Sequence, residues 1–241
     1  MPNYQNQRIF TITELKDETP EVLLVRLRAQ DGAKYTFDPG MFIMISGLEQ
    51  QTGKTYIARA FSIASEPELS EVELFVVKVH EGHTSHFIES RIGDTFLIGN
   101  PNGQFKFLPD KDSKVLFVAG GTGLAPFMSM LRHMKRINAD NDAILLYSIK
   151  YPTEIIKKEE LESLAQQLKL RTYITVTRPQ PGDGWAGETG HIDADKIRKL
   201  APDLSERGVY ICGPLPFVKA IKDALTSLGV PQERVKADVW G

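Results

Sequence analysis

The sequence has 241 residues, of which 41% are hydrophobic and 25% are charged, and its formal net charge is −2. This composition is that of an ordinary globular protein, and the length allows one large domain or two ordinary ones. The near-neutral charge offers no basic surface for nucleic acid, which we exclude as a partner. No apolar run reaches the roughly 18 to 20 residues that span a bilayer, and the N-terminal segment lacks the apolar core of a signal peptide. We therefore expect a cytoplasmic protein without a membrane span.

Cys212 is the only cysteine. A single cysteine excludes an intramolecular disulfide, and it excludes a zinc site or an iron–sulfur cluster held by cysteines of this chain alone. Any iron–sulfur centre that the protein serves must therefore lie on another protein.

The first part of the chain, from residue 8 to about 108, has an all-β pattern. Short runs rich in valine, isoleucine, phenylalanine and threonine are separated by glycine, proline, asparagine and aspartate. They predict a six-stranded antiparallel Greek-key β-barrel, which leaves no exposed sheet edge. A short helix at 84 to about 91 is expected to interrupt it, with Phe87, Ile88 and Ile92 turned inward. The predicted strands are 8–15, 21–29, 41–47, 57–64, 72–80 and 95–99.

The second part of the chain alternates between strand and helix patterns. A polar segment with a proline at 108–113 is the predicted linker, which places the two domains at 1–108 and 114–241. The alternation predicts a doubly wound, five-stranded parallel sheet with right-handed crossovers and helices on both faces. The predicted strands are 114–119, 143–149, 171–177, 208–212 and 234–239, and the predicted helices are 124–137, 153–169, 193–201 and 214–228.

A glycine-rich turn joins the first of these strands to the first helix, where Gly120 to Pro126 reads Gly-Gly-Thr-Gly-Leu-Ala-Pro. Glycine suits positions with positive φ and positions where a ligand approaches the backbone, and amides at a helix start suit a phosphate. Pro126 stands where the usual dinucleotide fingerprint has its third glycine, and the absence of a following Gly-Lys-Ser/Thr excludes a Walker loop. A glycine-rich turn that binds no phosphate is the alternative.

This turn resembles the nicotinamide-binding loop of the ferredoxin–NADP reductase family, in which proline at this place is usual. Arg59 to Ser62 reads Arg-Ala-Phe-Ser and resembles the family's Arg-x-Tyr-Ser flavin signature. Residues 78–85 resemble the second flavin segment, which ends in Gly-x-x-Ser. The resemblance implies a barrel that binds FAD, in preference to FMN, facing a sheet that binds NADP or NAD as substrate.

The flavin signature implies a role for each of its side chains. Arg59 would hold the flavin phosphates, Phe61 would stack on the isoalloxazine ring, and Ser62 would hydrogen-bond near flavin N5. Phe61 replaces a frequent tyrosine and lacks its phenolic hydrogen bond. An exposed arginine beside a core phenylalanine is the alternative interpretation. The cofactor contacts implied by the two flavin segments are Arg59, Ala60, Phe61, Ser62, Lys78, Val79, His80, Gly82, Thr84 and Ser85.

Cys212 to Pro214 reads Cys-Gly-Pro and resembles the family's Cys-Gly-x motif. It implies that Cys212 and Thr122 flank the nicotinamide, although a lone cysteine is often a small core residue. Near the chain end, Trp240 is the implied cover of the flavin ring, with Asp238 in place of a frequent glutamate. A tryptophan packed on its own sheet is the alternative. The implied catalytic residues are Ser62, Cys212, Asp238 and Trp240, and further nicotinamide contacts are Gly121, Thr122, Gly123, Lys150, Arg178, Gly213 and Pro214.

The choice between NADPH and NADH depends on charges after the second and third strands of the parallel sheet. An NAD-selective site offers a carboxylate there, and the region after 149 has no acid before Glu154. Lys150 is a cation, and Thr177 with Arg178 resembles the family's Ser-Arg pair that meets a 2′-phosphate. These cations favour NADPH, with NADH as the alternative.

The implied function is that of an FAD-containing oxidoreductase. It would take hydride from NAD(P)H and pass electrons to ferredoxin, flavodoxin or an oxygenase component. A free-flavin reductase and an electron-transfer subunit of a larger complex are the alternatives. His80, His83 and His86 are spaced in threes, but no cysteine or carboxylate completes a known ligand pattern, so we expect no metal site.

Overall fold

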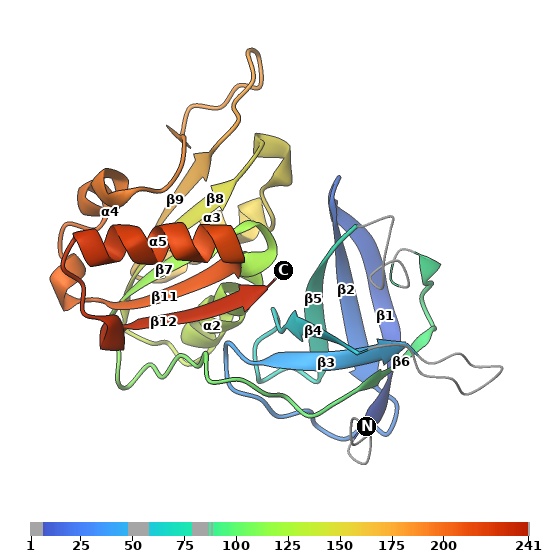
Figure 1. Cartoon of the computed structure of the whole chain (residues 1–241). Helices are drawn as coiled ribbons and strands as arrows, with labels where there is room; N and C mark the ends of the chain where they lie inside the picture. Colours follow the sequence, from blue (N-terminus) through green and yellow to red (C-terminus); the bar gives the residue numbers. More distant parts are fainter. Residues whose placement is uncertain (1–6, 48–57, 79–86, 88, 241) are drawn as a thin grey trace.

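The computed structural model describes residues 7–47, 58–78, 87 and 89–240. It contains two six-stranded sheets that lie side by side, one at each end of the chain (Figure 1). No helix in the described ranges combines the length and apolar character needed to cross a membrane.

The N-terminal sheet is antiparallel, with its strands in the order β4-β3-β6-β1-β2-β5. The two outer strands of that order approach each other, because Ala64, two residues beyond the end of β4, donates its N–H to the Glu73 carbonyl of β5 at 2.8 Å. This bond closes the sheet, so the predicted barrel is confirmed. Its strands are β1 (Arg8–Thr19), β2 (Val22–Ala29), β3 (Phe42–Gly47), β4 (Arg59–Ser62), β5 (Glu71–Val77) and β6 (Thr95–Ile98).

Apolar side chains fill the barrel interior, and their rings are in direct contact. Phe87 stacks on Phe96 with a centroid separation of 4.5 Å, and Phe10 meets Tyr35 edge-on at 5.0 Å. Phe87 is buried as predicted, but the expectation that Ile92 turns inward is wrong, because Ile92 is 66% exposed. Ile92 lies in a turn, where Gly93 has a φ of 98° and the Asp94 carboxylate accepts the Arg91 N–H at 2.8 Å. Residues 84–86 and 88 of the predicted helix lie outside the described ranges.

The C-terminal sheet is parallel throughout, with its strands in the order β10-β9-β8-β7-β11-β12. The predicted five strands are all present, and the two-residue β10 adds a sixth at the edge. From β7 the strand order runs one way to β8 and β9, and the other way to β11 and β12. A topological switch point therefore lies between β7 and β11. The strands are β7 (Lys114–Gly120), β8 (Asp142–Ile149), β9 (Leu170–Val176), β10 (Glu188–Thr189), β11 (Gly208–Pro214) and β12 (Val235–Trp240).

Helices cover both faces of the parallel sheet. Residues of α2 (Ala125–Arg136) and α3 (Lys158–Gln167) share one core with Val115 and Phe117 of β7. Those of α4 (Ala194–Leu200) and α5 (Leu215–Ser227) share a second core with Leu116 and Val118. Successive β7 side chains thus enter opposite cores, which explains its unbroken apolar run.

The third helix is shorter than the predicted 153–169. Pro152–Glu154 forms a separate 3-10 turn, and α3 begins at Lys158. Lys157 precedes it in the left-handed conformation, with a φ of 52°. That conformation turns the chain sharply between the two elements, so the helical pattern of the sequence cannot form one continuous helix.

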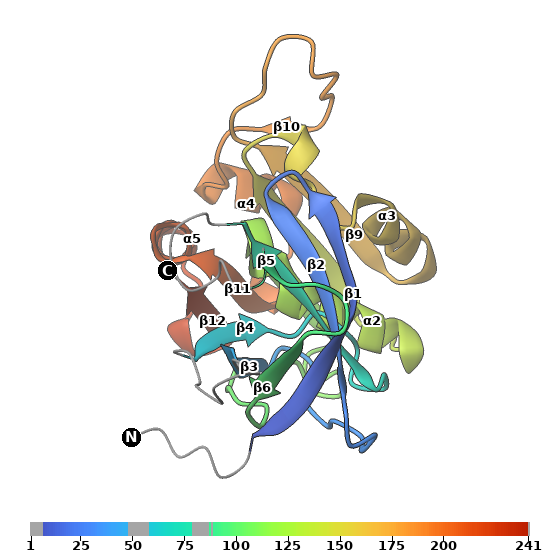
Figure 2. The ribbon, with the colours of Figure 1, turned by 90° about the vertical axis from the view of Figure 1, so that its right-hand side faces the viewer.

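The two sheets share a core through α2. Phe127 of α2 meets the ring of Phe105 edge-on at 5.8 Å, and Phe107 meets Phe117 of β7 at 5.7 Å. The predicted linker at 108–113 is tied to the parallel sheet, because the Tyr210 hydroxyl donates to the Asp112 carboxylate at 2.5 Å. The barrel and the parallel sheet are therefore packed against each other rather than joined only by the chain (Figure 2).

Candidate functional site

A cleft of about 960 Å³ lies at the carboxyl ends of the parallel strands. The ends of β7, β8 and β11 form one side, and Thr19, Glu21 and Val22 of the β1–β2 hairpin contribute from the barrel. Ligands of doubly wound sheets bind at this edge, beside the switch point. Of the residues that the sequence predicted as site residues, the cleft brings together Gly121, Thr122, Lys150, Arg178, Pro214 and Trp240.

The glycine-rich turn has the positive φ expected of it, but at Gly123 the close approach expected of a ligand is made by the protein backbone instead. Gly121 has a φ of 56° and open space around the place of a side chain. At Gly123, a Cβ would lie 2.3 Å from the carbonyl oxygen of Cys212, so the close approach is to β11 and not to a ligand. The Ala125 N–H bonds to the Thr122 carbonyl, and Pro126 has no N–H. A phosphate would therefore meet the turn at Gly121 and Thr122, ahead of the first turn of α2.

Ser62, Cys212 and Asp238 meet where the barrel touches the parallel sheet. Cys212 on β11 is in register with Asp238 on β12 and is fully buried. Burial raises the pKa of the Cys212 thiol, and the charge of Asp238 raises it further. Burial also raises the pKa of Asp238, against the opposing effect of hydrogen bonds from the Val239 backbone and from Ser62. Ser62 on β4 therefore lies beside Asp238 on β12, at the boundary between the two halves of the molecule.

Trp240 lies two residues beyond Asp238 on the same strand, so the two side chains point to the same face of β12. The indole is 38% exposed, and its strand position pairs with Pro214 at the end of β11. Of the four residues implied as catalytic, Trp240 lines the cleft, whereas Ser62, Cys212 and Asp238 are not among its lining residues.

The flavin signature on β4 is partly engaged with the barrel. Arg59 and Ala60 are exposed, and Arg59 makes no ion pair with a described residue. The half-buried Phe61 packs against the barrel core, with its ring edge-on to Phe87 at 5.4 Å. This placement matches the alternative of an exposed arginine beside a core phenylalanine.

Only the first residue of the second flavin segment is described. The Lys78 N–H donates to the Glu21 carbonyl at 2.8 Å, and its ammonium contacts Asp17 at 2.7 Å. Lys78 therefore fastens β5 to the β1–β2 hairpin that borders the cleft. The remaining predicted residues lie outside the described ranges, as do two further histidines of the chain: Val79, His80, Gly82, Thr84, Ser85, His83 and His86.

Lys150 and Arg178 lie side by side at the far end of the cleft, because the Arg178 N–H donates to the Lys150 carbonyl at 2.9 Å. Both side chains are exposed, and neither forms an ion pair within the described part of the chain. Glu154 also lines the cleft and accepts the Lys150 N–H at 3.1 Å. Two free cations at one end of a nucleotide-sized cleft suit a phosphate.

The barrel wall of the cleft was not predicted. Glu18 on β1 accepts the Lys157 N–H at 2.8 Å, which holds the β1–β2 hairpin against the start of α3. Its carboxylate also lies 3.5 Å from the Lys157 ammonium. No local pattern marks Glu21 as a wall residue or Glu18 as a partner of Lys157, because both roles depend on packing between distant parts of the chain.

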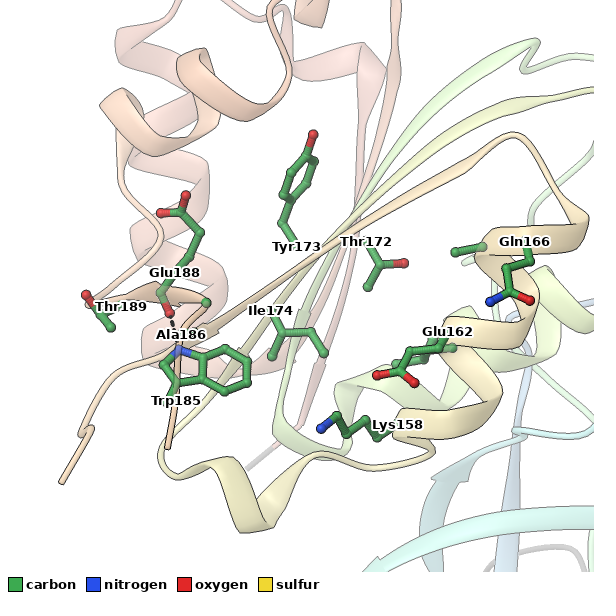
Figure 3. A pocket seen from close by; sticks show the side chains of 13 residues that line it. Lys158, Glu162, Gln166, Thr172, Tyr173, Ile174, Trp185, Ala186, Glu188 and Thr189 are labelled. Carbon is green, nitrogen blue, oxygen red and sulfur yellow. Dashed lines mark hydrogen bonds between the residues drawn. The ribbon is translucent and has the colours of Figure 1, made fainter. Parts of the chain in front are cut away.

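A second hollow, of about 760 Å³, lies between α3 and β9. Figure 3 shows the Trp185 indole facing Ile174 and the residues of α3, with its N–H donating to the Glu188 carbonyl at 2.9 Å. No described residue lines both hollows. None of the predicted site residues lies in this second one.

The fold and the cleft together define a class of protein in which an antiparallel β-barrel meets the ligand-binding edge of a dinucleotide-type parallel sheet. Residues 117–223 match the family model of the oxidoreductase NAD-binding domain. The glycine betaine monooxygenase reductase subunit of Pseudomonas aeruginosa (strain UCBPP-PA14) is 29% identical over 228 residues, covering 93% of this chain and 62% of that protein. The chain thus spans less than two thirds of the length of this relative.

Solved structures share the fold over almost the whole chain. The ferredoxin reductase in carbazole 1,9a-dioxygenase has a TM-score of 0.84 and 25% identity, over 98% of this chain and 70% of its own. A ferredoxin NADP+ reductase from Neisseria gonorrhoeae with bound FAD and NADP has a TM-score of 0.81 and 22% identity, over 97% and 98%. In sequence and fold, the chain is thus similar to reductases of the ferredoxin–NADP reductase type, to which the sequence motifs also pointed.

Proposed function

We propose that the protein binds FAD on its barrel, accepts hydride from NAD(P)H in the cleft, and passes electrons to a protein acceptor. The observation that carries this proposal is that Ser62 of the flavin-signature strand lies beside Asp238, on the same strand as Trp240, which lines the cleft. When bound, the two cofactors supply the redox chemistry themselves. The chain contributes binding, orientation and exclusion of water.

The described residues fit a flavin at the mouth of the barrel. The exposed guanidinium of Arg59, which forms no ion pair with a described residue, would bind flavin phosphates in a bidentate fork. Ser62 is held by Asp238 with its hydroxyl at the domain boundary, where it would meet flavin N5. Ala60, Phe61, Lys78, Val79, His80, Gly82, Thr84 and Ser85 complete the proposed flavin contacts.

On the nicotinamide side, Gly121 and Thr122 would meet the diphosphate, and Gly123, Cys212, Gly213 and Pro214 would form the wall behind the ring. Because the pKa of the buried Cys212 thiol is raised, the thiol stays protonated and offers an uncharged surface. It therefore positions the nicotinamide and does not act as a nucleophile.

Trp240 is proposed to cover the flavin ring until nicotinamide displaces it. Support comes from its place in the cleft, on the same strand face as Asp238, and from its half-exposed indole. Trp240→Ala is expected to increase flavin fluorescence and to tighten nicotinamide binding severalfold, because no side chain then competes for the ring. Unchanged fluorescence together with an unchanged nicotinamide Kd would refute this role.

We propose NADPH as the preferred coenzyme, because Lys150 and Arg178 are adjacent, exposed cations at one end of the cleft. Arg178→Ala is expected to lower kcat/KM for NADPH by about 10- to 100-fold and to change that for NADH about threefold or less, since only NADPH carries the 2′-phosphate. Wild-type protein that uses NADH as efficiently as NADPH would contradict the preference.

The acceptor is proposed to be an oxygenase component, a ferredoxin or a flavodoxin. The support is that the Pseudomonas relative is a monooxygenase reductase subunit and that a fold neighbour is the ferredoxin reductase of a dioxygenase. With NAD(P)H as the electron source, we place the protein in the cytoplasm. Service as an electron-transfer subunit of a larger complex is the second candidate, supported by the same relative.

The central test is a visible spectrum of the purified protein before and after anaerobic addition of NADPH. We expect a flavin spectrum that survives desalting and bleaches on addition of NADPH. Loss of the yellow colour on desalting, with activity restored by added flavin, would favour a free-flavin reductase. If the flavin is retained but neither NADPH nor NADH reduces it, the remaining hypothesis is a non-catalytic subunit of a larger complex.

A further inference from the structure

Arg132 on α2 is a nearly buried cation with partners in both halves of the molecule. Its side chain is 10% exposed. Toward the barrel, one guanidinium nitrogen donates to the Ala64 carbonyl at 2.7 Å and to the Glu73 carboxylate at 2.8 Å. Toward α3, two other nitrogens bind the Glu160 carboxylate at 2.6 and 2.8 Å. The planar guanidinium of Arg132 therefore bonds to groups on both sides of the boundary between the two halves of the molecule.

The barrel partners of Arg132 are themselves fixed. Glu73 is 2% exposed and also accepts from Arg26 at 2.9 Å, while Arg26 binds Glu14 at 2.6 Å. The Glu73 carbonyl accepts the Ala64 N–H, and its own N–H donates to the Ser65 hydroxyl at 3.1 Å. Arg132 is thus anchored to the strand pair that closes the barrel.

These contacts are connected through the chain to both proposed cofactor segments. Ala64 follows Ser62 of the flavin signature by two residues, and α2 begins directly after the glycine-rich turn. The apolar contacts around them, such as Phe105 with Phe127, are non-directional and permit sliding. A planar guanidinium that hydrogen-bonds three acceptor groups at once permits very little sliding.

We propose that Arg132 is a positioning residue that sets the separation and angle between the flavin segment and the nicotinamide turn. The proposal rests on the proposed function, because hydride transfer depends on the distance between the two rings. Arg132 touches no cofactor and acts through Ala64 and Glu73 on one side and through α2 on the other. A buried ion network adds little net stability compared with apolar packing, so its main effect is on geometry.

The test compares Arg132→Met and Arg132→Lys with the wild type. Lysine keeps the charge beside Glu73 but cannot hold three acceptors in a fixed fork. The matched control is Arg136→Met on the same helix, because the Arg136 side chain is 53% exposed and lies 4.0 Å from Glu66.

The first readout needs no cofactor. Spin labels at Gln30→Cys on the barrel and Lys222→Cys on α5, both exposed positions, report the distance between the two halves. We expect a single narrow distance distribution in the wild type and in Arg136→Met. Arg132→Met is expected to give a broadened distribution, and Arg132→Lys an intermediate one.

The second readout is the rate constant of flavin reduction by NADPH in anaerobic single-turnover experiments. Arg132→Met should slow it at least about tenfold, Arg132→Lys should recover part of the loss, and the NADPH Kd should change by about twofold or less. If Arg132→Met does not fold, Arg132→Lys alone must show broadening and at least about a threefold slower rate. Variants with wild-type distances and rates overturn the proposal, even if their Tm falls.

Failure of the proposed function gives a different result. In that case the wild-type flavin is not reduced, while the distance measurement still reports whether Arg132 holds the two halves together. A broadened distribution with an unchanged reduction rate would overturn the positioning role and leave the proposed function intact.

Discussion

Gly123 lies against the backbone of β11, and the reason for its lack of a side chain is steric. A Cβ there would be 2.3 Å from the Cys212 carbonyl oxygen and 2.8 Å from the Gly213 nitrogen. Gly121, two residues earlier, has open space but a positive φ of 56°. The two glycines of one turn thus meet different physical requirements.

We expect Gly123→Ala to lower the free energy of unfolding by roughly 2–3 kcal/mol, because the obstructing atoms are backbone and cannot move aside. Gly121→Ala is the matched control and should cost only about 1 kcal/mol, the price of a positive φ for a residue with a Cβ. Urea unfolding followed by tryptophan fluorescence measures both. A Gly123→Ala loss no larger than that of Gly121→Ala would show that the turn can shift away from β11.

Cys212 is expected to be chemically inert in the folded protein. Burial and the nearby Asp238 charge both raise the pKa of its thiol, and the thiolate is the reactive form. An aromatic disulfide reagent should react at least about 100-fold more slowly with native than with urea-unfolded protein. Similar rates in the two states would mean that β11 opens locally, and the proposed wall behind the nicotinamide would then be wrong.

At the scale of elements, α4 provides a direct test of helix capping. It begins after Asp193, whose carboxylate accepts the Lys196 N–H at 2.8 Å, as a helix cap should. The helix has only seven residues, so its first turn is a large part of it. Its two buried residues, Ile197 and Leu200, pack in the core that α4 and α5 share with one face of the parallel sheet.

Asp193→Ala should therefore destabilise the protein by about 1 kcal/mol, the usual effect of losing a cap. Asp195→Ala in the first turn is the control. The Asp195 side chain is 89% exposed in its pair with Arg198, so its removal should cost less than about 0.5 kcal/mol. Thermal unfolding measures both, and equal losses for the two variants would rule out a special role for the cap.

At the scale of the whole molecule, Arg207 ties together segments that are far apart in the chain. Its side chain is fully buried and donates to Asp203 at 2.7 Å, to the Asp142 carboxylate at 2.9 Å and to the Val115 carbonyl at 3.0 Å. Hydrogen bonds from Arg207 lower the pKa of Asp203 from its ordinary 3.8 to about 2. The starts of β7 and β8 are thereby joined to the loop before β11.

This contact predicts a defined pH dependence of stability. Because the folded-state pKa of Asp203 is below its unfolded-state value, its contribution is complete above pH 3.8 and is lost as pH falls through about 2. After allowance for solvent screening, we expect a loss of about 1–2 kcal/mol across that window. Asp203→Asn should be less stable at pH 7 and should lose less on acidification. Parallel pH profiles for the two proteins would contradict the assignment.

Local patterns were enough to predict most elements and the order of the motifs. The apolar run of β7, the glycine-rich turn and the 3.6-residue period of α2 depend on neighbouring residues, so the sequence predicted them within a few positions. The two-residue β10 has no such pattern and was missed. Ile92 was placed wrongly, because a turn, and not its hydrophobicity, decides where its side chain points.

The sequence by itself was enough to predict the fold class, the likeness to known reductases and the candidate side chains of the site, because backbone preferences and motif spacing act over short distances along the chain. Only the tertiary structure decided how the two halves meet. It brought Ser62 to Asp238, placed the β1–β2 hairpin beside the cleft, and joined Arg132 to Glu73. Such contacts link residues that are dozens to more than a hundred positions apart, and they depend on packing and charge pairing that no local pattern encodes.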